Sequence, residues 1–91
     1  MTKFITAAIV KATPAMRSQE NVEDPTVTAK WFSIVGNHRW YMTEYDPTTK
    51  RAFGLVTTSQ SPQGELGYFD LSELENMKRG ALPLVERDLY W

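Results

Sequence analysis

The pattern of apolar and polar residues predicts a short helix near the beginning of the chain. Thr6 can cap its first turn, and Ile5, Ile9 and Val10 form an apolar stripe with helical spacing. Pro14 limits the helix, because the residue before a proline is pushed out of the α region. The alternative, an edge strand over the same residues, is disfavoured by two consecutive alanines.

Alternating apolar and polar residues, rich in aromatic and β-branched types, then predict an antiparallel meander. Gly36-Asn37 and Asp46-Pro47 supply its turns. Gly54 lies in the middle of a strand, which indicates a bulge or the close approach of another backbone or ring. The predicted strands cover residues 26–34, 39–45, 52–58 and, after a polar loop, 66–69.

Asp70 is predicted to cap a second helix near residues 71–79. The carboxylate of Asp70 and Glu73 three residues later fit the capping-box pattern, and Gly80 suits the position after the helix. The run over residues 84–91 is expected to rejoin the sheet. We therefore predict a single α+β domain over residues 1–91, with a mostly antiparallel four- to five-stranded sheet and two helices covering one face.

Composition restricts the chemistry that this domain can carry. The 91 residues include no cysteine and one histidine, so we expect no disulfide, metal site or cofactor. A formal net charge of −1 argues against bulk phosphate binding and against phosphate mimicry. Without cysteines, a secretory signal or an apolar run of membrane-spanning length, the chain is expected to be cytoplasmic and to make no membrane contact.

Carboxylates are the remaining catalytic candidates. Glu20, Glu44, Glu65, Glu86 and Asp88 lie near aromatic residues in the sequence, and apolar surroundings could raise a carboxyl pKa enough for general-acid catalysis. The preferred interpretation is structural, with these groups holding strand ends in register. Arg87 could bridge to Glu44 or Glu65 across the sheet, or present its guanidinium to a partner.

Aromatic residues occur as adjacent pairs on the predicted strands, so each pair places one ring on either face. Helices cover one face; the other must be covered by something else or present aromatic surface. Exposed Trp, Tyr and Arg are typical of protein interfaces. Single-stranded nucleic acid could also stack on such rings, with a modest basic groove supplied by Lys30, Arg39, Lys50 and Arg51.

These patterns define two groups of candidate residues. Those expected to be structural are Trp40, Phe53, Gly54, Gly67, Phe69 and Asp70. We predict severe damage from Trp40→Ala, through a cavity, and from Gly67→Val, through backbone conformation. The partner-binding candidates are Glu44, Tyr45, Gln60, Gln63, Glu65, Tyr68, Arg87, Asp88 and Trp91.

Three motifs in one order resemble a small family of uncharacterised proteins, catalogued as a domain of unknown function and carried mainly by bacterial plasmids, integrative elements and phages. The motifs are Trp40-Tyr41-Met42-Thr43-Glu44-Tyr45-Asp46, Glu65-Leu66-Gly67-Tyr68-Phe69 and Glu86-Arg87-Asp88-Leu89. Some members are found near anti-restriction genes. The resemblance implies a non-enzymatic protein-binding accessory protein of a mobile element, with an anti-CRISPR or anti-restriction inhibitor as its specific form.

Two other functions stay open. The first is an accessory of plasmid DNA metabolism that binds nucleic acid weakly. The second is a hydrolase or nuclease that uses Glu44, Glu65, Glu86 and Asp88 with magnesium. The oligomeric state does not follow from the sequence.

Overall fold

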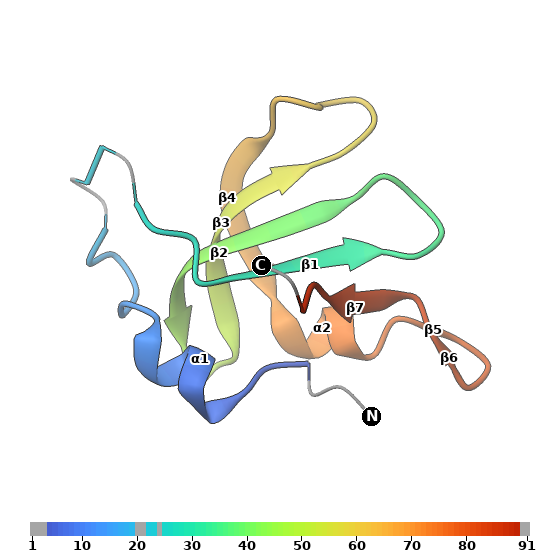
Figure 1. The fold of residues 1–91 in the computed structure, drawn as a ribbon, viewed down its shortest axis with the longest axis horizontal. Helices are drawn as coiled ribbons and strands as arrows, with labels where there is room; N and C mark the ends of the chain where they lie inside the picture. Colours follow the sequence, from blue (N-terminus) through green and yellow to red (C-terminus); the bar gives the residue numbers. More distant parts are fainter. Residues whose placement is uncertain (1–3, 20–21, 24, 90–91) are drawn as a thin grey trace.

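The computed structural model describes residues 4–19, 22–23 and 25–89. In these residues the chain forms a five-stranded antiparallel sheet of order β4-β3-β2-β1-β7 and a separate two-stranded hairpin, β5-β6 (Figure 1). The helices are α1 (Ala7–Ala12) and α2 (Leu71–Glu75). The strands are β1 (Ala29–Ser33), β2 (Arg39–Asp46), β3 (Arg51–Thr57), β4 (Glu65–Asp70), β5 (Lys78–Arg79), β6 (Leu82–Pro83) and β7 (Val85–Arg87). The expected α+β class is confirmed.

Side-chain caps begin both helices where the sequence predicted them. The Thr6 hydroxyl accepts a hydrogen bond from the Ile9 amide at 3.1 Å, and α1 ends at Ala12, before Pro14. The Asp70 carboxylate accepts from the Ser72 amide at 2.9 Å and so begins α2. Each cap satisfies an amide that has no partner within its helix.

The second helix is shorter than predicted. It ends at Glu75, and residues 78–83 form the β5-β6 hairpin instead of a final helical turn. Gly80, with φ +62°, lies in the turn of this hairpin and does not follow a helix end. The Leu84 amide donates to the Met77 carbonyl at 2.9 Å, so pairing between the arms of the hairpin replaces helical hydrogen bonds.

The hydrophobic core lies between the sheet and the two helices. Trp31 and Met42 are fully buried, and the Phe4 ring stacks on Trp31 with centroids 5.6 Å apart. The Trp31 indole N–H donates to the Phe4 carbonyl at 2.9 Å, which satisfies its one polar group. The other buried apolar residues are Ala29, Trp40, Tyr45, Ala52, Phe69, Leu71, Leu74 and Val85. The expected structural positions of Trp40 and Phe69 are confirmed.

A β-bulge in β2 accounts for the glycine in β3. The register runs from Met42 opposite Gly54 to Glu44 opposite Phe53, which leaves Thr43 as the extra residue. A Cβ atom on Gly54 would lie 1.7 Å from the Tyr41 carbonyl oxygen, so only glycine fits there. The predicted bulge and close backbone approach are both confirmed.

Gly67 does not have the structural role that we predicted for it. It lies opposite Gly54 on β4, but its φ is not positive and a Cβ atom would meet nothing within 4 Å. An L-residue can adopt this strand conformation without strain. Backbone conformation, the reason that we gave for severe damage from Gly67→Val, therefore does not apply at this position.

Candidate interaction face

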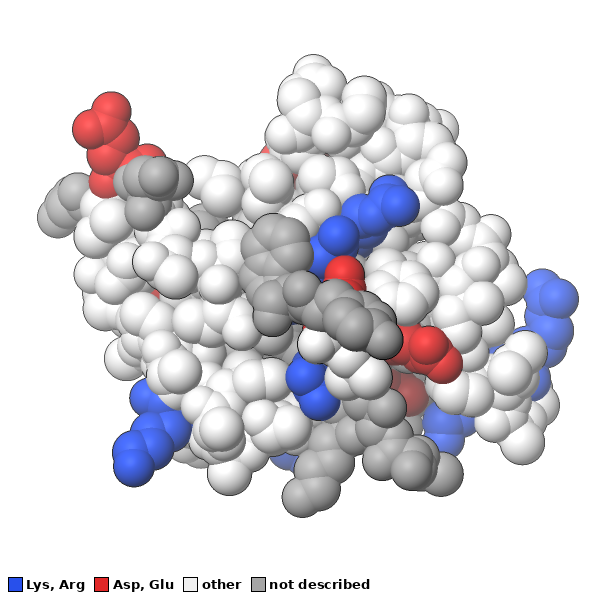
Figure 2. Space-filling view, viewed as in Figure 1, with Lys and Arg blue, Asp and Glu red and all other residues white. Residues whose placement is uncertain are grey.

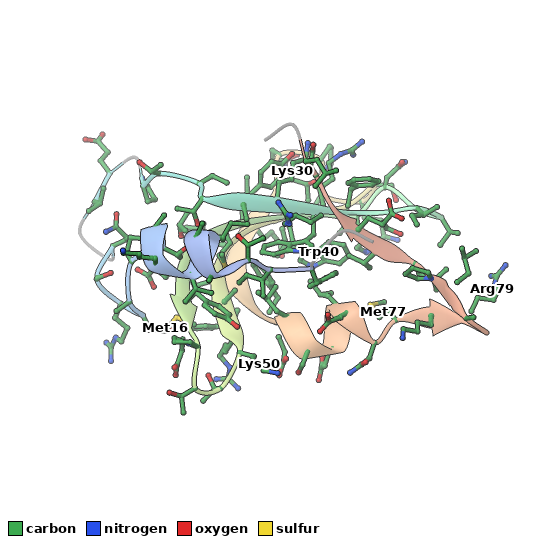
Figure 3. All side chains as sticks on the ribbon, turned by 60° about the horizontal axis from the view of Figure 1, so that its bottom comes forward. Met16, Lys30, Trp40, Lys50, Met77 and Arg79 are labelled. Atoms are coloured by element: carbon green, nitrogen blue, oxygen red, sulfur yellow. The ribbon has the colours of Figure 1, made fainter. Side chains whose placement is uncertain are left out.

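One face of the sheet points away from the helices; we call it the outer face. Paired residues in neighbouring strands share a face, and residues alternate between faces along each strand. In Figure 3 the side chain of Lys30 lies on this side of the sheet, whereas Trp40 points toward the helices. The register places on the outer face Lys30, Phe32, Arg39, Tyr41, Phe53, Leu55, Leu66 and Tyr68.

The part of the outer face on β3 and β4 exposes apolar and aromatic side chains. Leu66 is 68% exposed and Tyr68 is 59% exposed, although both lie on a regular strand. The Phe53 ring, half-buried, meets the Tyr68 ring edge to face with centroids 5.0 Å apart. The Arg51 guanidinium lies 5.9 Å from the centre of the same tyrosine ring. Tyrosine, arginine and aliphatic groups are thus presented together to solvent.

The loop between β3 and β4 extends this area. Gln60 and Gln63 are exposed on it, as expected for partner-binding residues. The Ser61 amide donates to the Thr58 hydroxyl at 3.0 Å, and the Gly64 amide donates to the Ser61 carbonyl at 3.0 Å. These local bonds give the loop a defined shape.

The β1 and β7 side of the outer face is more polar. The Lys30 ammonium lies 3.7 Å from the Asp88 carboxylate and 5.3 Å from the centre of the Tyr41 ring. Glu86 is exposed nearby on β7. Lys30 therefore contacts both an acid and a tyrosine here, and the large apolar side chains exposed on the strands of the outer face, Leu66 and Tyr68, belong to β4.

The register separates Arg87 from Glu65 and Glu44, the two acids to which its structural interpretation would join it. Arg87 lies beside Trp31, on the opposite face from Glu86, as the alternation predicted. Glu65 begins β4 at the other edge of the sheet, roughly 19 Å away across four strand spacings. The other acid, Glu44, uses both of its carboxylate oxygens for backbone amides.

Glu44 and Tyr45 are internal, although we predicted both to bind a partner. The Glu44 side chain is 3% exposed, and its two carboxylate oxygens accept from the amides of Arg17 at 2.8 Å and Gln19 at 2.7 Å. The Tyr45 amide donates to the Pro14 carbonyl at 3.0 Å. The turn that includes Arg17, whose φ is +67°, is therefore attached to β2. Burial, followed by nearby acids, raises the pKa of the Tyr45 phenol.

Replacing Glu44 by alanine should loosen this attachment. The change leaves two amides without their carboxylate acceptor, so we expect a loss of about 2–4 kcal/mol in the free energy of unfolding. Glu44→Gln keeps one acceptor oxygen and should lose less. Urea denaturation measures the effect, with exposed Glu65→Ala as the matched control, expected within about 0.5 kcal/mol of wild type. Equal stability of E44A and E65A would contradict this role.

The four carboxylates of the hydrolase hypothesis do not form one site, and Glu20 lies outside the described residues. Glu44 is held inside, Glu65 lies on β4, and Glu86 and Asp88 lie at or just after β7 on the opposite edge. Over residues 4–19, 22–23 and 25–89, no group of three or more His, Cys, Asp or Glu could hold a metal ion. The carboxylate cluster required by the hydrolase hypothesis is not assembled from these residues.

A shallow cavity of about 350 Å³ lies at the end of β4. It is lined by Arg51, Tyr68, Phe69, Asp70 and Glu73. Asp70 is already engaged as the cap of α2, and the hydrogen bond from the Ser72 hydroxyl holds its pKa below the usual value. This cavity is continuous with the tyrosine–arginine contact of the outer face.

The structure brings together some of the predicted binding residues and separates others. Gln60, Gln63, Glu65 and Tyr68 belong to β4 and the loop before it, whereas Arg87 and Asp88 lie at the other edge. Trp91 lies outside the described residues. Leu66 was not among the predicted binding residues; its alternation with Tyr68 on the fourth predicted strand was the available signal.

Fold and face together define a small α+β domain, with helices on one side of an antiparallel sheet and exposed aromatic and aliphatic groups on the other. The chain belongs to the family described as protein of unknown function (DUF2958), whose family model matches residues 1–91. No curated protein and no solved structure matches it significantly. None of the helices in the described part of the chain is long and apolar enough to cross a membrane.

Proposed function

We propose that this protein is a non-enzymatic accessory protein that binds another protein through the β3–β4 part of the outer face. The observation that carries the proposal is the exposure of Leu66 and Tyr68 side by side on one face of a regular strand. Aromatic and arginine side chains are enriched at the energetic centres of protein interfaces. Phe53 and Arg51 support the tyrosine ring, which reduces its freedom before binding.

The distribution of charge favours recognition by shape over recognition by bulk charge. In Figure 2, Lys and Arg atoms lie interspersed with Asp and Glu atoms among uncharged ones on the visible face. With a formal net charge of −1 the chain has an acidic surplus of a single charge, too small to imitate a nucleic acid. A partner would therefore be bound through apolar contact and local hydrogen bonds.

The resemblance to a family carried by plasmids, integrative elements and phages suggests the class of partner. We propose a host defence complex, such as a CRISPR or restriction effector, with this protein acting as its inhibitor in a mobile element. Expression in a bacterial strain that carries one defined defence system tests the role. Phage plating efficiency should rise at least tenfold with the wild-type chain against the susceptible system.

Matched variants connect that phenotype to the face. Leu66→Ser with Tyr68→Ser should abolish the rise in plating, whereas Val35→Ser, at a position 61% exposed in the β1–β2 connection, should preserve it. Circular dichroism checks that all variants fold. An unchanged plating efficiency across restriction and CRISPR systems, with no defence or replication protein captured from lysate, would contradict the proposal.

Single-stranded nucleic acid is the second candidate ligand, favoured by the contact of Arg51 with Tyr68. Lys30 and Arg39 share the same face with aromatic rings, which is the composition of a stacking platform. Fluorescence anisotropy with a labelled oligothymidylate tests it, because electrostatic binding must weaken as salt is raised. Absence of binding at low salt would exclude this candidate.

A further inference from the structure

The two edges of the sheet are protected to very different degrees. β7 has three residues, two of them charged, and begins soon after Pro83. β4 has six residues with its two charged ones, Glu65 and Asp70, at its ends; it contains no proline, basic residue or bulge, and it exposes Leu66 and Tyr68 in between. Edge strands are usually blunted by such devices because their free backbone groups pair with other chains. β4 is therefore the edge of the sheet at which a strand of another chain can pair.

One hydrogen bond reveals which backbone groups of β4 point outward. The Leu71 amide donates to the Lys50 carbonyl at 2.9 Å, which continues the register that pairs Arg51 with Asp70. In an antiparallel pair, alternate residues direct both N–H and C=O toward the same neighbour. Like Leu71, Gly67 therefore bonds to β3. The N–H and C=O of Leu66 and Tyr68 point away from the sheet.

We propose that a second copy of this chain pairs with that edge, β4 against β4, about a two-fold axis beside Gly67. Directly opposed residues must share a face, so a symmetric antiparallel pair has to be centred on a residue. Centring on Gly67 places Leu66 opposite Tyr68 of the second copy. The outward N–H and C=O groups of both residues are then used in both chains, giving four hydrogen bonds. The two sheets become one.

The edge of β4 is complementary to itself, so the chain that pairs with it is a second copy of this protein. Leu66 against tyrosine is a favourable aromatic–aliphatic cross-strand pair, and it occurs twice. Gly67 meets its own copy at the close, non-hydrogen-bonded position, and the space around it is open. Glu65 falls opposite Phe69 of the second copy, so the acids of the two chains are not directly opposed. A two-fold axis beside Leu66 or Tyr68 would bring that residue opposite its own copy. The leucine–tyrosine pairs would then be lost.

The size of the edge sets the strength of this association. Two six-residue strands bury less than the roughly 1,600 Å² of a standard stable interface. The dimer should therefore depend on concentration. It joins the outer faces of both copies into one surface and does not require the proposed function, because it would form whichever partner binds there.

A cysteine at Gly67 tests both the pairing and its register in a chain that has no native cysteine. The opposed Cα atoms would lie about 4.5 Å apart, within the range that a disulfide spans. Gly67→Cys should form an intermolecular disulfide at least tenfold faster than Ser59→Cys in the exposed loop. Leu66→Cys should not exceed that control, because the register separates its two copies by more than about 7 Å.

Sedimentation of the unmodified protein provides a second measurement. The average mass should rise from 10.4 kDa near 1 μM toward twice that value near 1 mM. Tyr68→Pro removes an outward N–H while sparing the bonds to β3. For this variant, the increase in average mass should require a protein concentration at least tenfold higher. A monomer throughout the range, or a dimer in which Gly67→Cys crosslinks no faster than Ser59→Cys, would overturn the proposal. Failure of the plating test would not affect it.

Discussion

Gly54→Ala should destabilise the protein more than the same change at any other glycine of the chain. The new Cβ atom would lie 1.7 Å from the Tyr41 carbonyl oxygen, a backbone atom that cannot rotate away. Strands β2 and β3 would have to separate beside the bulge at Thr43. We expect a loss of at least about 3 kcal/mol in the free energy of unfolding, measured by urea denaturation.

Gly67→Ala is the matched control for that experiment. It adds the same methyl group to the register partner of Gly54, where a Cβ atom meets nothing within 4 Å. We expect its stability to stay within about 1 kcal/mol of wild type, since alanine also reduces the freedom of the unfolded chain. Equal losses from the two alanines would contradict the close approach of the Tyr41 carbonyl to Gly54.

Trp31→Ala should produce the second large loss. Trp31 is fully buried, stacks on Phe4 and donates its indole N–H to the Phe4 carbonyl. Truncation creates a cavity between the sheet and the segment before α1. We expect a loss of about 3–5 kcal/mol by thermal or urea unfolding. Trp40→Ala, at a position 8% exposed, should be severe for the same reason.

Two comparisons separate packing from hydrogen bonding at Trp31. Trp31→Phe keeps an aromatic ring but removes the N–H donor, so its loss should be intermediate. Val35→Ala, at an exposed position, should change stability by less than about 0.5 kcal/mol. A Trp31→Ala variant within about 1 kcal/mol of wild type would contradict the assigned core.

Gly54 and Trp31 also matter for the proposed function, because they keep the two faces of the sheet distinct. The bulge opposite Gly54 places Glu44 on the same side of the sheet as Phe53, where it is buried and its carboxylate accepts from the amides of Arg17 and Gln19. On the side of the helices, Trp31 stacks on Phe4 and donates a hydrogen bond to its carbonyl. Leu66 and Tyr68 are exposed on a strand of this sheet and not on a loop.

Local chemistry predicted much of this fold correctly. Thr6 and Asp70 begin helices because a side-chain oxygen can satisfy an amide within three residues of itself. The meander followed from alternation and turn residues. Gly54 was recognisable because a glycine inside a strand commonly marks a bulge or a close backbone approach.

The errors arose where distant residues compete for the same backbone. The pattern after Asp70 suits a longer helix, but the chain beyond Asn76 pairs with residues 82–84 instead. Gly67 was assigned a conformational role from its residue type alone. Its neighbours leave its Cβ position empty.

In the candidate site, too, some features depend on residues close in the chain and others on residues far apart. By itself, the sequence determined the helix caps, the strands and their alternating faces, because these depend on interactions between residues close in the chain. The tertiary structure decided which polar groups remain available. Glu44 became internal because an amide 25 residues earlier binds its carboxylate. Leu66 and Tyr68 became exposed because β4 is an edge strand, and strand order depends on the packing of the whole sheet.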